Sequence, residues 1–153
     1  MSIVNINYHA KLIKQLPPHY FQNKRPPQQV ILPCAHNGRL VIFKSGKCRI
    51  MGCKSPLTDV TSLPLPLVVT RIQSITVKLE LGKTINLREL ANTLGSHNCT
   101  YEPEIFPALR LTKDFLPLCV NVFASGKIII LGIKTLDIQP YCHKVTTYLN
   151  NFL

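Results

Sequence analysis

The sequence predicts an α+β fold in which a curved antiparallel sheet carries helices on one face. Three observations lead to this prediction. A β-hairpin pattern occurs twice, further segments alternate apolar and polar residues as strands do, and two segments have apolar residues at helical spacing. The chain has 153 residues, of which 46% are hydrophobic, so it can form one compact domain or two small fused halves.

The hairpin pattern is an internal duplication. Residues 40–55 read LVIFKSGKCRIMGCKS, residues 120–135 read VNVFASGKIIILGIKT, and seven of the sixteen positions are identical at an offset of 80 residues. Each copy has an apolar run that ends in Phe, then Ser-Gly-Lys, then a second apolar run, which is typical of a β-hairpin with a glycine turn. Two copies of one supersecondary unit are therefore expected to make up the fold.

Alternation along each predicted hairpin puts one set of side chains on a common face. In the first copy this set is Val41, Phe43, Lys47, Arg49 and Met51, and in the second it is Asn121, Phe123, Lys127, Ile129 and Leu131. Phe beside Lys on an open face suits a surface that neutralises phosphates and inserts between bases. The alternative is a core Phe next to a solvated Lys, which is common in hairpins.

The remaining elements follow the same plan in each half: a strand, a helix and four further strands, with a closing helix in the second half only. The first half is expected to have a strand over Ser2–His9, a short helix over Lys11–Leu16 and a strand over Val30–Leu32. The second half is expected to have a strand over Gln73–Leu81, a strand at Phe106 and a last helix over 138–152. Between the first two of these, Asn86 and Glu89 form a capping-box pattern and Gly95 is expected to end the helix.

Charge points to an acidic partner, with nucleic acid first. The net charge is +11, and it is uneven: residues 1–76 hold ten Lys and Arg against Asp59 alone, whereas residues 77–153 hold eight against six acids. No catalytic carboxylate pair, nucleophile constellation or phosphate-cradling glycine loop is present, so we expect neither an enzyme nor a cofactor. Neither a signal peptide nor an apolar run of membrane-spanning length is found, and no membrane partner is expected.

The six cysteines have no CxxC spacing, and buried thiols in a reducing compartment explain them best. A zinc site built from Cys34, His36, Cys48 and Cys53 is an alternative that supplies four ligands, although its spacing matches no common pattern. No metal is therefore included among the expected ligands.

The segment YEPEIFP at 101–107, followed by a strand and then VFASGKIIILGIK, resembles the TATA-box-binding protein family. The resemblance covers residues 73–153 well and residues 2–55 loosely. It implies a saddle with pseudo-two-fold symmetry and helices on the convex face. It also implies a truncated first repeat over 1–60 that lacks the long closing helix, a linker over 61–72, and a second repeat over 73–153. The trimmed first half suggests a divergent, minimal member, such as one encoded by a virus or a parasite.

In the resembled family, the concave face lies in the minor groove and pairs of Phe wedge base steps open. Phe106 and Phe123 match one pair, and Phe43 matches one member of the other, whose mate falls at Pro26 or Pro27. Lys47, Lys54, Lys127 and Lys134 match phosphate-contacting positions, with a solubilising rim as the alternative. The remaining positions that the resemblance implies on DNA are Ser2, Val4, Val41, Arg49, Met51, Ser74, Thr76, Asn121, Ile129 and Leu131.

The sequence departs from the family at the centre of the expected DNA face. Ser2 and Ser74 replace paired Asn, and Met51 and Leu131 replace paired Thr, so hydrogen-bond donors are lost there. Because minor-groove readout is already degenerate, a weaker preference for A·T steps is expected. Arg49 either enters a narrow minor groove or is solvated.

Two functions of different classes remain. The first is a transcription initiation factor that binds and bends AT-rich promoter DNA. It would recruit a B-type general initiation factor or an RNA polymerase subunit through Glu102, Glu104 and Ile105. The second is an interaction module of a transcription complex with weak or no specific DNA binding. For either, a nuclear location is expected, or the host nucleus or a cytoplasmic factory for a viral protein.

Overall fold

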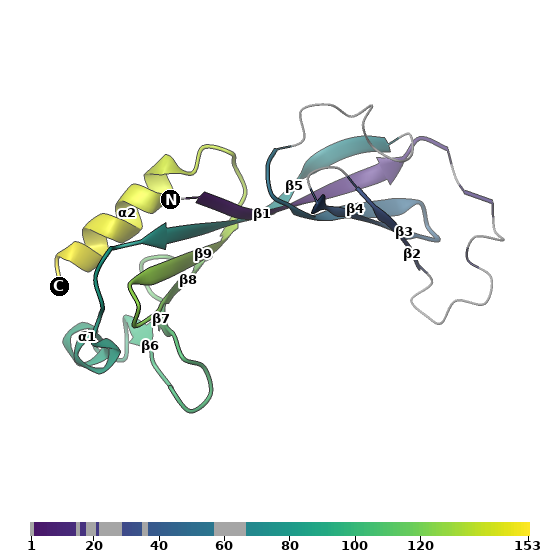
Figure 1. The fold of residues 1–153 in the computed structure, drawn as a ribbon. Helices are drawn as coiled ribbons and strands as arrows, with labels where there is room; N and C mark the ends of the chain where they lie inside the picture. The colour runs from purple at the N-terminus through teal and green to yellow at the C-terminus, as the bar shows by residue number, and fades with distance from the viewer. Residues whose placement is uncertain (1, 15, 18–20, 22–28, 35–36, 57–66) are drawn as a thin grey trace. The chain divides into compact units, whose positions relative to one another are not determined.

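The computed structural model describes residues 2–14, 16–17, 21, 29–34, 37–56 and 67–153 (Figure 1). The described chain is α+β and forms two compact units. The first unit is Ile3–Ile75, and the second is Thr76–Leu153 together with Ser2. Among the described residues, no helix is long and apolar enough to cross a membrane.

The first unit is a sheet with the strand order β2-β3-β4-β1-β5. Its strands are β1 (Ser2–Leu12), β2 (Gln29–Pro33), β3 (Arg39–Phe43), β4 (Lys47–Cys53) and the first part of β5 (Leu67–Glu80). The pairs β2/β3, β3/β4 and β1/β4 are antiparallel. No α-helix occurs among the described residues of this unit.

The second unit continues from the end of β5 and has the strand order β5-β9-β8-β7-β6. Its elements are α1 (Leu87–Leu94), β6 (Cys99–Thr100), β7 (Leu109–Leu111), β8 (Cys119–Val122), β9 (Lys127–Ile133) and α2 (Gln139–Asn150). The order of strand, helix, four strands and closing helix is as the sequence predicts. The two helices found in the described part of the chain belong to this unit (Figure 1).

The two hairpins have the same turn geometry, as expected for a duplication. Gly46 and Gly126 have φ of 88° and 89°, in a backbone region that residues other than glycine rarely adopt. Their N–H groups donate to the carbonyl oxygens of Phe43 and Phe123 at 2.9 and 3.0 Å. Each turn glycine also accepts a hydrogen bond, from the N–H of Leu12 in one unit and of Leu81 in the other.

Each sheet buries one face, and the alternation of side chains decides which. In the first hairpin Leu40, Ile42 and Ile50 are fully buried, and the equivalent Val120, Val122 and Ile130 are fully buried in the second. The helices of the second unit add their own buried stripes, which are Leu87, Leu90, Leu94, Cys142, Val145 and Leu149. Burial of this apolar surface provides most of the stabilisation of each unit.

The capping prediction for α1 is confirmed. Asn86 is the N-cap, and its side-chain oxygen accepts a hydrogen bond from the Glu89 N–H at 3.2 Å. Gly95 ends the helix with φ of 80°, and its N–H donates to the Ala91 carbonyl oxygen. The last helix also forms close to its expected range, with Ile138 as N-cap and Pro140 in the first turn.

The short helix expected over Lys11–Leu16 is wrong, because strand β1 runs on to Leu12. Alternation continues through this stretch, with Ala10 and Leu12 buried, and Leu12 is held by its hydrogen bond to the Gly46 carbonyl oxygen. Cross-strand pairing and burial therefore outweigh the weak local helix propensity. Of the four further strands expected in the first half, the described residues contain β2, β3 and β4.

The strand expected at Phe106 is also wrong. Phe106 lies in a turn in which its N–H and that of Ile105 both donate to the Glu102 carbonyl oxygen at 2.9 Å. Pro103 and Pro107 cannot donate to a ladder, which explains why the strand begins only at Leu109. In addition, β5 begins at Leu67 rather than at Gln73, so the expected linker over 61–72 contains its first residues.

An alanine substitution is expected to lower the free energy of unfolding by different amounts at the two turn glycines. A Cβ at Gly46 would meet nothing within 4 Å, whereas one at Gly126 would overlap the Lys83 backbone carbonyl. We expect Gly46→Ala to cost about 1–2 kcal/mol through its backbone conformation alone. Gly126→Ala should cost at least about 1 kcal/mol more, because a backbone atom must move. Urea unfolding of both variants measures the difference, and equal costs would contradict it.

Candidate nucleic-acid interface

The open face of the first hairpin carries the side chains that alternation assigns to it. Val41 is 9% exposed and Phe43 is half-buried, whereas Lys47, Arg49 and Met51 are exposed. Pairing of Val41 with Arg49 and of Arg39 with Met51 holds these residues side by side across β3 and β4. Phe43 is therefore neither a core side chain nor a fully solvated one, and it lies on the same face as the cations Lys47 and Arg49.

A groove of about 640 Å³ occupies this face of the first unit. None of the described residues that line it is acidic, and Arg39, Arg49 and Lys54 give it positive charge. The sequence prediction had included only Val41, Phe43, Arg49, Met51 and Lys54 among them. The lining residues that it missed are Asn5, Asn7, Gln29, Ile31, Asn37, Arg39 and Gly52.

Two of the missed residues follow from the alternation of β1. Ile6 and Tyr8 are buried, so Asn5 and Asn7 point to the opposite, open side of the strand. The predicted Ser2 and Val4 are exposed and half-buried and have the same parity as Ile6. Continuing the alternation through residues 2–8 would have found the Asn pair. Residues of β2, by contrast, join the groove only because β2 pairs with β3.

Asn7 is fixed at an irregularity in the sheet. The register of β1 against β4 shifts between Ile6 and Tyr8, and at this point the Asn7 side-chain oxygen accepts a hydrogen bond from the Gly52 N–H at 3.0 Å. Because that bond uses the oxygen, the Asn7 amide nitrogen is left as the donor. The bulge therefore orients one hydrogen-bond donor at the groove.

The open face of the second hairpin is more apolar. Lys127 is exposed, Phe123, Ile129 and Leu131 are half-buried, and Asn121 is 8% exposed. Asn121 pairs with Ile129 across β8 and β9 and with Arg110 across β7. Its side-chain oxygen accepts a weak hydrogen bond from the Cys119 thiol at 3.7 Å. This face therefore presents mainly apolar surface, with few polar groups that are free to form hydrogen bonds.

Phe106 and Phe123 form an aromatic pair at the edge of this face. Their ring centroids are 6.2 Å apart, with an edge-to-face angle of 69°. Phe106 is 40% exposed although it is a large apolar side chain, and it is presented by the turn that follows Glu102. The counterpart in the first unit differs: Phe43 pairs across the strands with Gln29, and the expected mates Pro26 and Pro27 lie outside the described residues.

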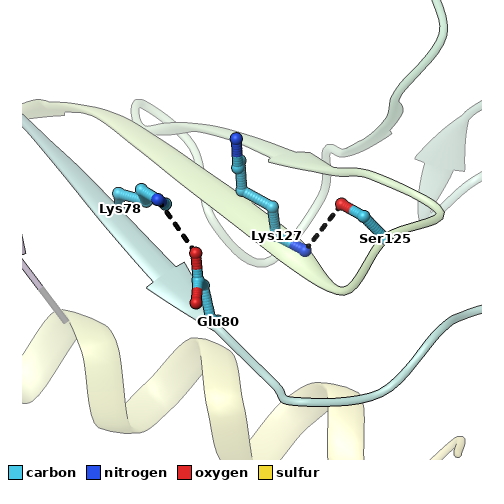
Figure 2. A network of polar contacts seen from close by, with 4 residues as sticks. All are labelled: Lys78, Glu80, Ser125 and Lys127. Atoms are coloured by element: carbon cyan, nitrogen blue, oxygen red, sulfur yellow. Dashed lines mark hydrogen bonds and ion pairs between the residues drawn. The ribbon is translucent and has the colours of Figure 1, made fainter.

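An ion pair on β5 lies near the charged residue Lys127 (Figure 2). Its N–H donates to the Ser125 side-chain oxygen at 3.4 Å, as the N–H of Lys47 does to Ser45. On β5, which also presents the half-buried Ser74 and Thr76, Lys78 forms an ion pair with the exposed Glu80 at 2.9 Å. The hydrogen bond from Lys78, its charge and that of Lys127 lower the pKa of Glu80. Glu80 therefore stays negative at neutral pH and offsets part of the positive charge.

The remaining predicted positions are exposed. Glu102, Glu104 and Ile105 form one projecting turn, in which Ile105 is 79% exposed. Lys54 follows β4 and lines the groove of the first unit. Lys134 follows β9 and lines a different, apolar hollow beside α2.

The cysteines behave as core residues. Cys48, Cys53, Cys99 and Cys142 are buried, and none of the six described cysteines forms a disulfide. Burial raises the pKa of Cys53 to about 11, with a contribution from Cys34, so its thiol is neutral at physiological pH. No group of three or more His, Cys, Asp or Glu side chains that could hold a metal is found in the described part of the chain, and His36 lies outside it.

Comparison with known proteins identifies the family. Residues 69–152 match the family described as transcription factor TFIID (or TATA-binding protein, TBP), which is more than half of the chain. The chain belongs to the TBP family. The duplicated hairpins and the aromatic pair are thus features of a chain in a family of transcription factors.

Archaeal TATA-box-binding proteins are among the relatives of this chain. TATA-box-binding protein E of Halobacterium salinarum is 33% identical over 125 residues, which is 71% of this chain and 66% of that protein. The protein of Natronomonas pharaonis is 34% identical over 112 residues, and the chain spans 59% of its length. The protein of Archaeoglobus fulgidus is 27% identical over 138 residues, or 82% of this chain and 75% of that protein.

A solved TBP has the same fold. The Methanococcus jannaschii TBP superposes with a TM-score of 0.74 and 24% identity, covering 99% of this chain and 98% of that one. The predicted fold class, α+β of the TBP type, is therefore confirmed. The role of each predicted DNA-contacting residue stays a prediction.

Asn7 and Asn5 provide a matched test of the groove wall. Asn7→Ala removes the acceptor of the Gly52 N–H, whereas the buried side-chain oxygen of Asn5 has no hydrogen-bond partner among the described residues. We expect Asn7→Ala to lower the free energy of unfolding by about 1–2 kcal/mol, because a part-buried amide loses its partner. Asn5→Ala should cost no more than about 0.5 kcal/mol. Chemical unfolding measures the free energy of unfolding of both variants. A larger cost for Asn5→Ala than for Asn7→Ala would contradict the stabilising role given to the hydrogen bond between Asn7 and Gly52.

Proposed function

We propose that this TBP family member is a transcription initiation factor that binds duplex DNA through the minor groove and bends it. The observation that carries the proposal is the edge-to-face pair of Phe106 and Phe123, at the edge of the open face that also carries the exposed Lys127. A partly exposed aromatic pair is the apolar wedge that opens a base step, and a neighbouring lysine neutralises phosphate. We propose no catalytic role and no cofactor.

The two units are proposed to contribute differently to DNA binding. The first unit has the electropositive groove, with Arg39, Arg49 and Lys54, but among the described residues that line it Phe43 is the one aromatic wedge. The second unit has the complete aromatic pair but carries Glu80 beside its lysines. We therefore propose that phosphate attraction comes mainly from the first unit and base-step opening mainly from the second. Residues 1–60 and 73–153 would be the two repeats.

The preferred DNA is proposed to be AT-rich promoter sequence with relaxed selectivity. Met51 and Leu131 offer no hydrogen-bond donor at the centre of each face, and Asn121 is buried and bonded to Cys119. The Asn7 amide nitrogen is a donor in the groove, and A·T pairs present acceptors in the minor groove. Selectivity would thus come from groove width and deformability more than from base contacts.

Recruitment is proposed through the turn that contains Glu102, Glu104 and Ile105. Two carboxylates beside an exposed Ile form an acidic and apolar projection on a basic protein, which suits a basic partner. The partner would be a B-type general initiation factor or an RNA polymerase subunit. The nuclear location and the viral origin stay predictions.

A second candidate function is an interaction module without specific DNA binding. The apolar character of the second face, with Ile129 and Leu131 half-buried, favours it, because such a face also suits a protein partner. A protein that binds its protein partner but does not bend DNA would have this second function and not the first.

The aromatic pair is tested by measuring DNA bending. Fluorescence transfer between the ends of labelled AT-rich and scrambled duplexes is measured across a salt series. The Phe106→Ala/Phe123→Ala variant is expected to abolish bending and to weaken binding by about tenfold or more, since the apolar contact that stabilises the opened base step is lost. Phe152→Ala is the control, because Phe152 has the same exposure, 39%, and lies on the C-terminal side of α2.

Phe43→Ala is expected to weaken binding less than Phe106→Ala or Phe123→Ala. A larger effect of Phe43→Ala would overturn the proposal that base-step opening comes mainly from the second unit. Binding that is straight, salt-labile and indifferent to Phe106 and Phe123 would instead overturn the bending function and favour the interaction module.

Glu80 provides an electrostatic test. Glu80→Gln removes a negative charge beside Lys78 and Lys127, so we expect DNA binding to strengthen several-fold at low salt and the gain to fade as salt rises. The control is Glu89→Gln, which removes an exposed carboxylate from α1. Fluorescence anisotropy gives both affinities. Equal gains in the two variants would mean that Glu80 acts only through net charge.

A further inference from the structure

An apolar hollow of about 580 Å³ lies in the second unit, among residues that the DNA-binding proposal leaves unused except for Lys134. It is built from the connection between β7 and β8, the end of β9 and the first turns of α2. Its lining residues are Phe115, Leu116, Pro117, Leu118, Gly132, Lys134, Pro140, Tyr141 and Lys144. The volume matches that of sites that take one or two large side chains or a small ligand.

The floor of the hollow is fixed by packing. Phe115 is 3% exposed, and its ring meets Tyr148 of α2 edge to face at 5.0 Å. The Lys144 ammonium group lies 5.0 Å from the centre of the same ring and donates a hydrogen bond to the Asp114 carbonyl oxygen at 2.8 Å. Because three contacts hold Phe115 and Lys144, this surface is largely preorganised, which lowers the entropy cost of binding.

The rim of the hollow combines exposed apolar surface with positive charge. Leu116 is 71% exposed and so adds apolar surface at the rim. Lys134 and Lys144 are both exposed, and no lining residue is acidic. Asp114 and Asp137 lie nearby in the sequence but do not line it. The start of α2 adds to the positive side, since Ile138 provides no capping side chain and the first turn has no acid.

We propose that this hollow docks a short peptide segment of a partner protein, in which a large apolar side chain is flanked by carboxylates. The apolar side chain would fill the space between Phe115, Leu116 and Tyr141, and the carboxylates would pair with Lys134 and Lys144. A nucleic-acid backbone would use the lysines but leave the apolar walls in water, so the lining favours a peptide. The docking site does not depend on DNA binding.

The test uses a fluorescein-labelled synthetic peptide of alternating Asp and Leu with one central Phe. One control peptide has Lys in place of Asp, and another has Ser in place of Leu and Phe. Anisotropy with the full chain is expected to give a Kd of order 10–100 µM for the acidic apolar peptide, as for short docking motifs. Both control peptides should bind at least about tenfold more weakly. Amide chemical shifts should change at 115–116, 118, 132–134 and 141–144.

Two variants and a matched control locate the site. Leu116→Asp and Lys144→Glu are each expected to weaken peptide binding by about tenfold or more. Lys113→Glu makes the same charge change at an exposed lysine of the same connection that does not line the hollow, and it should change binding less than about twofold. Leu116 is largely exposed, so its substitution leaves the fold intact, and thermal unfolding checks both variants.

Three outcomes would overturn the proposal. The first is the absence of saturable binding, and the second is binding that is equal for the acidic apolar and acidic serine peptides. The third is a short duplex that competes with the peptide and depends on Lys144 but not on Leu116, which would make this surface a nucleic-acid contact. DNA bending by Phe106 and Phe123 is measured in a separate experiment. A negative result in the peptide-binding test would therefore not contradict the DNA-binding proposal.

Discussion

Each unit depends on a hairpin that can bury only one of its two faces. Leu40, Ile42 and Ile50 in one copy, and Val120, Val122 and Ile130 in the other, lie in the core with almost no exposure. Because side chains alternate strictly along a strand, burying these residues forces Phe43, Arg49, Phe123 and Lys127 to the other side. The candidate interface is thus a direct consequence of how the core is formed.

The turn glycines keep this arrangement in register. Gly46 and Gly126 close each hairpin and also accept a hydrogen bond from the end of the first strand of their repeat. A slip of one residue would break these bonds and exchange the two faces. The second copy is more tightly constrained, because the Lys83 carbonyl packs against its turn. The same supersecondary unit therefore tolerates less change in the second half than in the first.

Divergence has given the two copies different surfaces on one backbone plan. The first groove is lined by amides and cations, including the Asn7 side chain held by Gly52. The second face is apolar, with a buried Asn121 and an aromatic pair at its edge. Core positions differ between the copies only among apolar residues, as in Ile42 and Val122 or Cys48 and Ile128, whereas open-face positions also differ in polarity and charge, as in Val41 and Asn121 or Arg49 and Ile129. This difference in polarity and charge is the reason why different roles are proposed for the two units.

The sequence by itself determined the repeated hairpins, the faces of their side chains, the α1 cap at Asn86 and the family resemblance. These features are local, since they rest on alternation, a glycine turn and a capping pattern. Tertiary structure decided what local signals could not. Cross-strand bonds extended β1 through Lys11 to Leu12, and two prolines kept Phe106 in a turn that brings it to Phe123. Gln29 and Arg39 reached one groove, and Phe115 met Lys144, only through pairings between segments distant in the chain, which residue spacing does not encode.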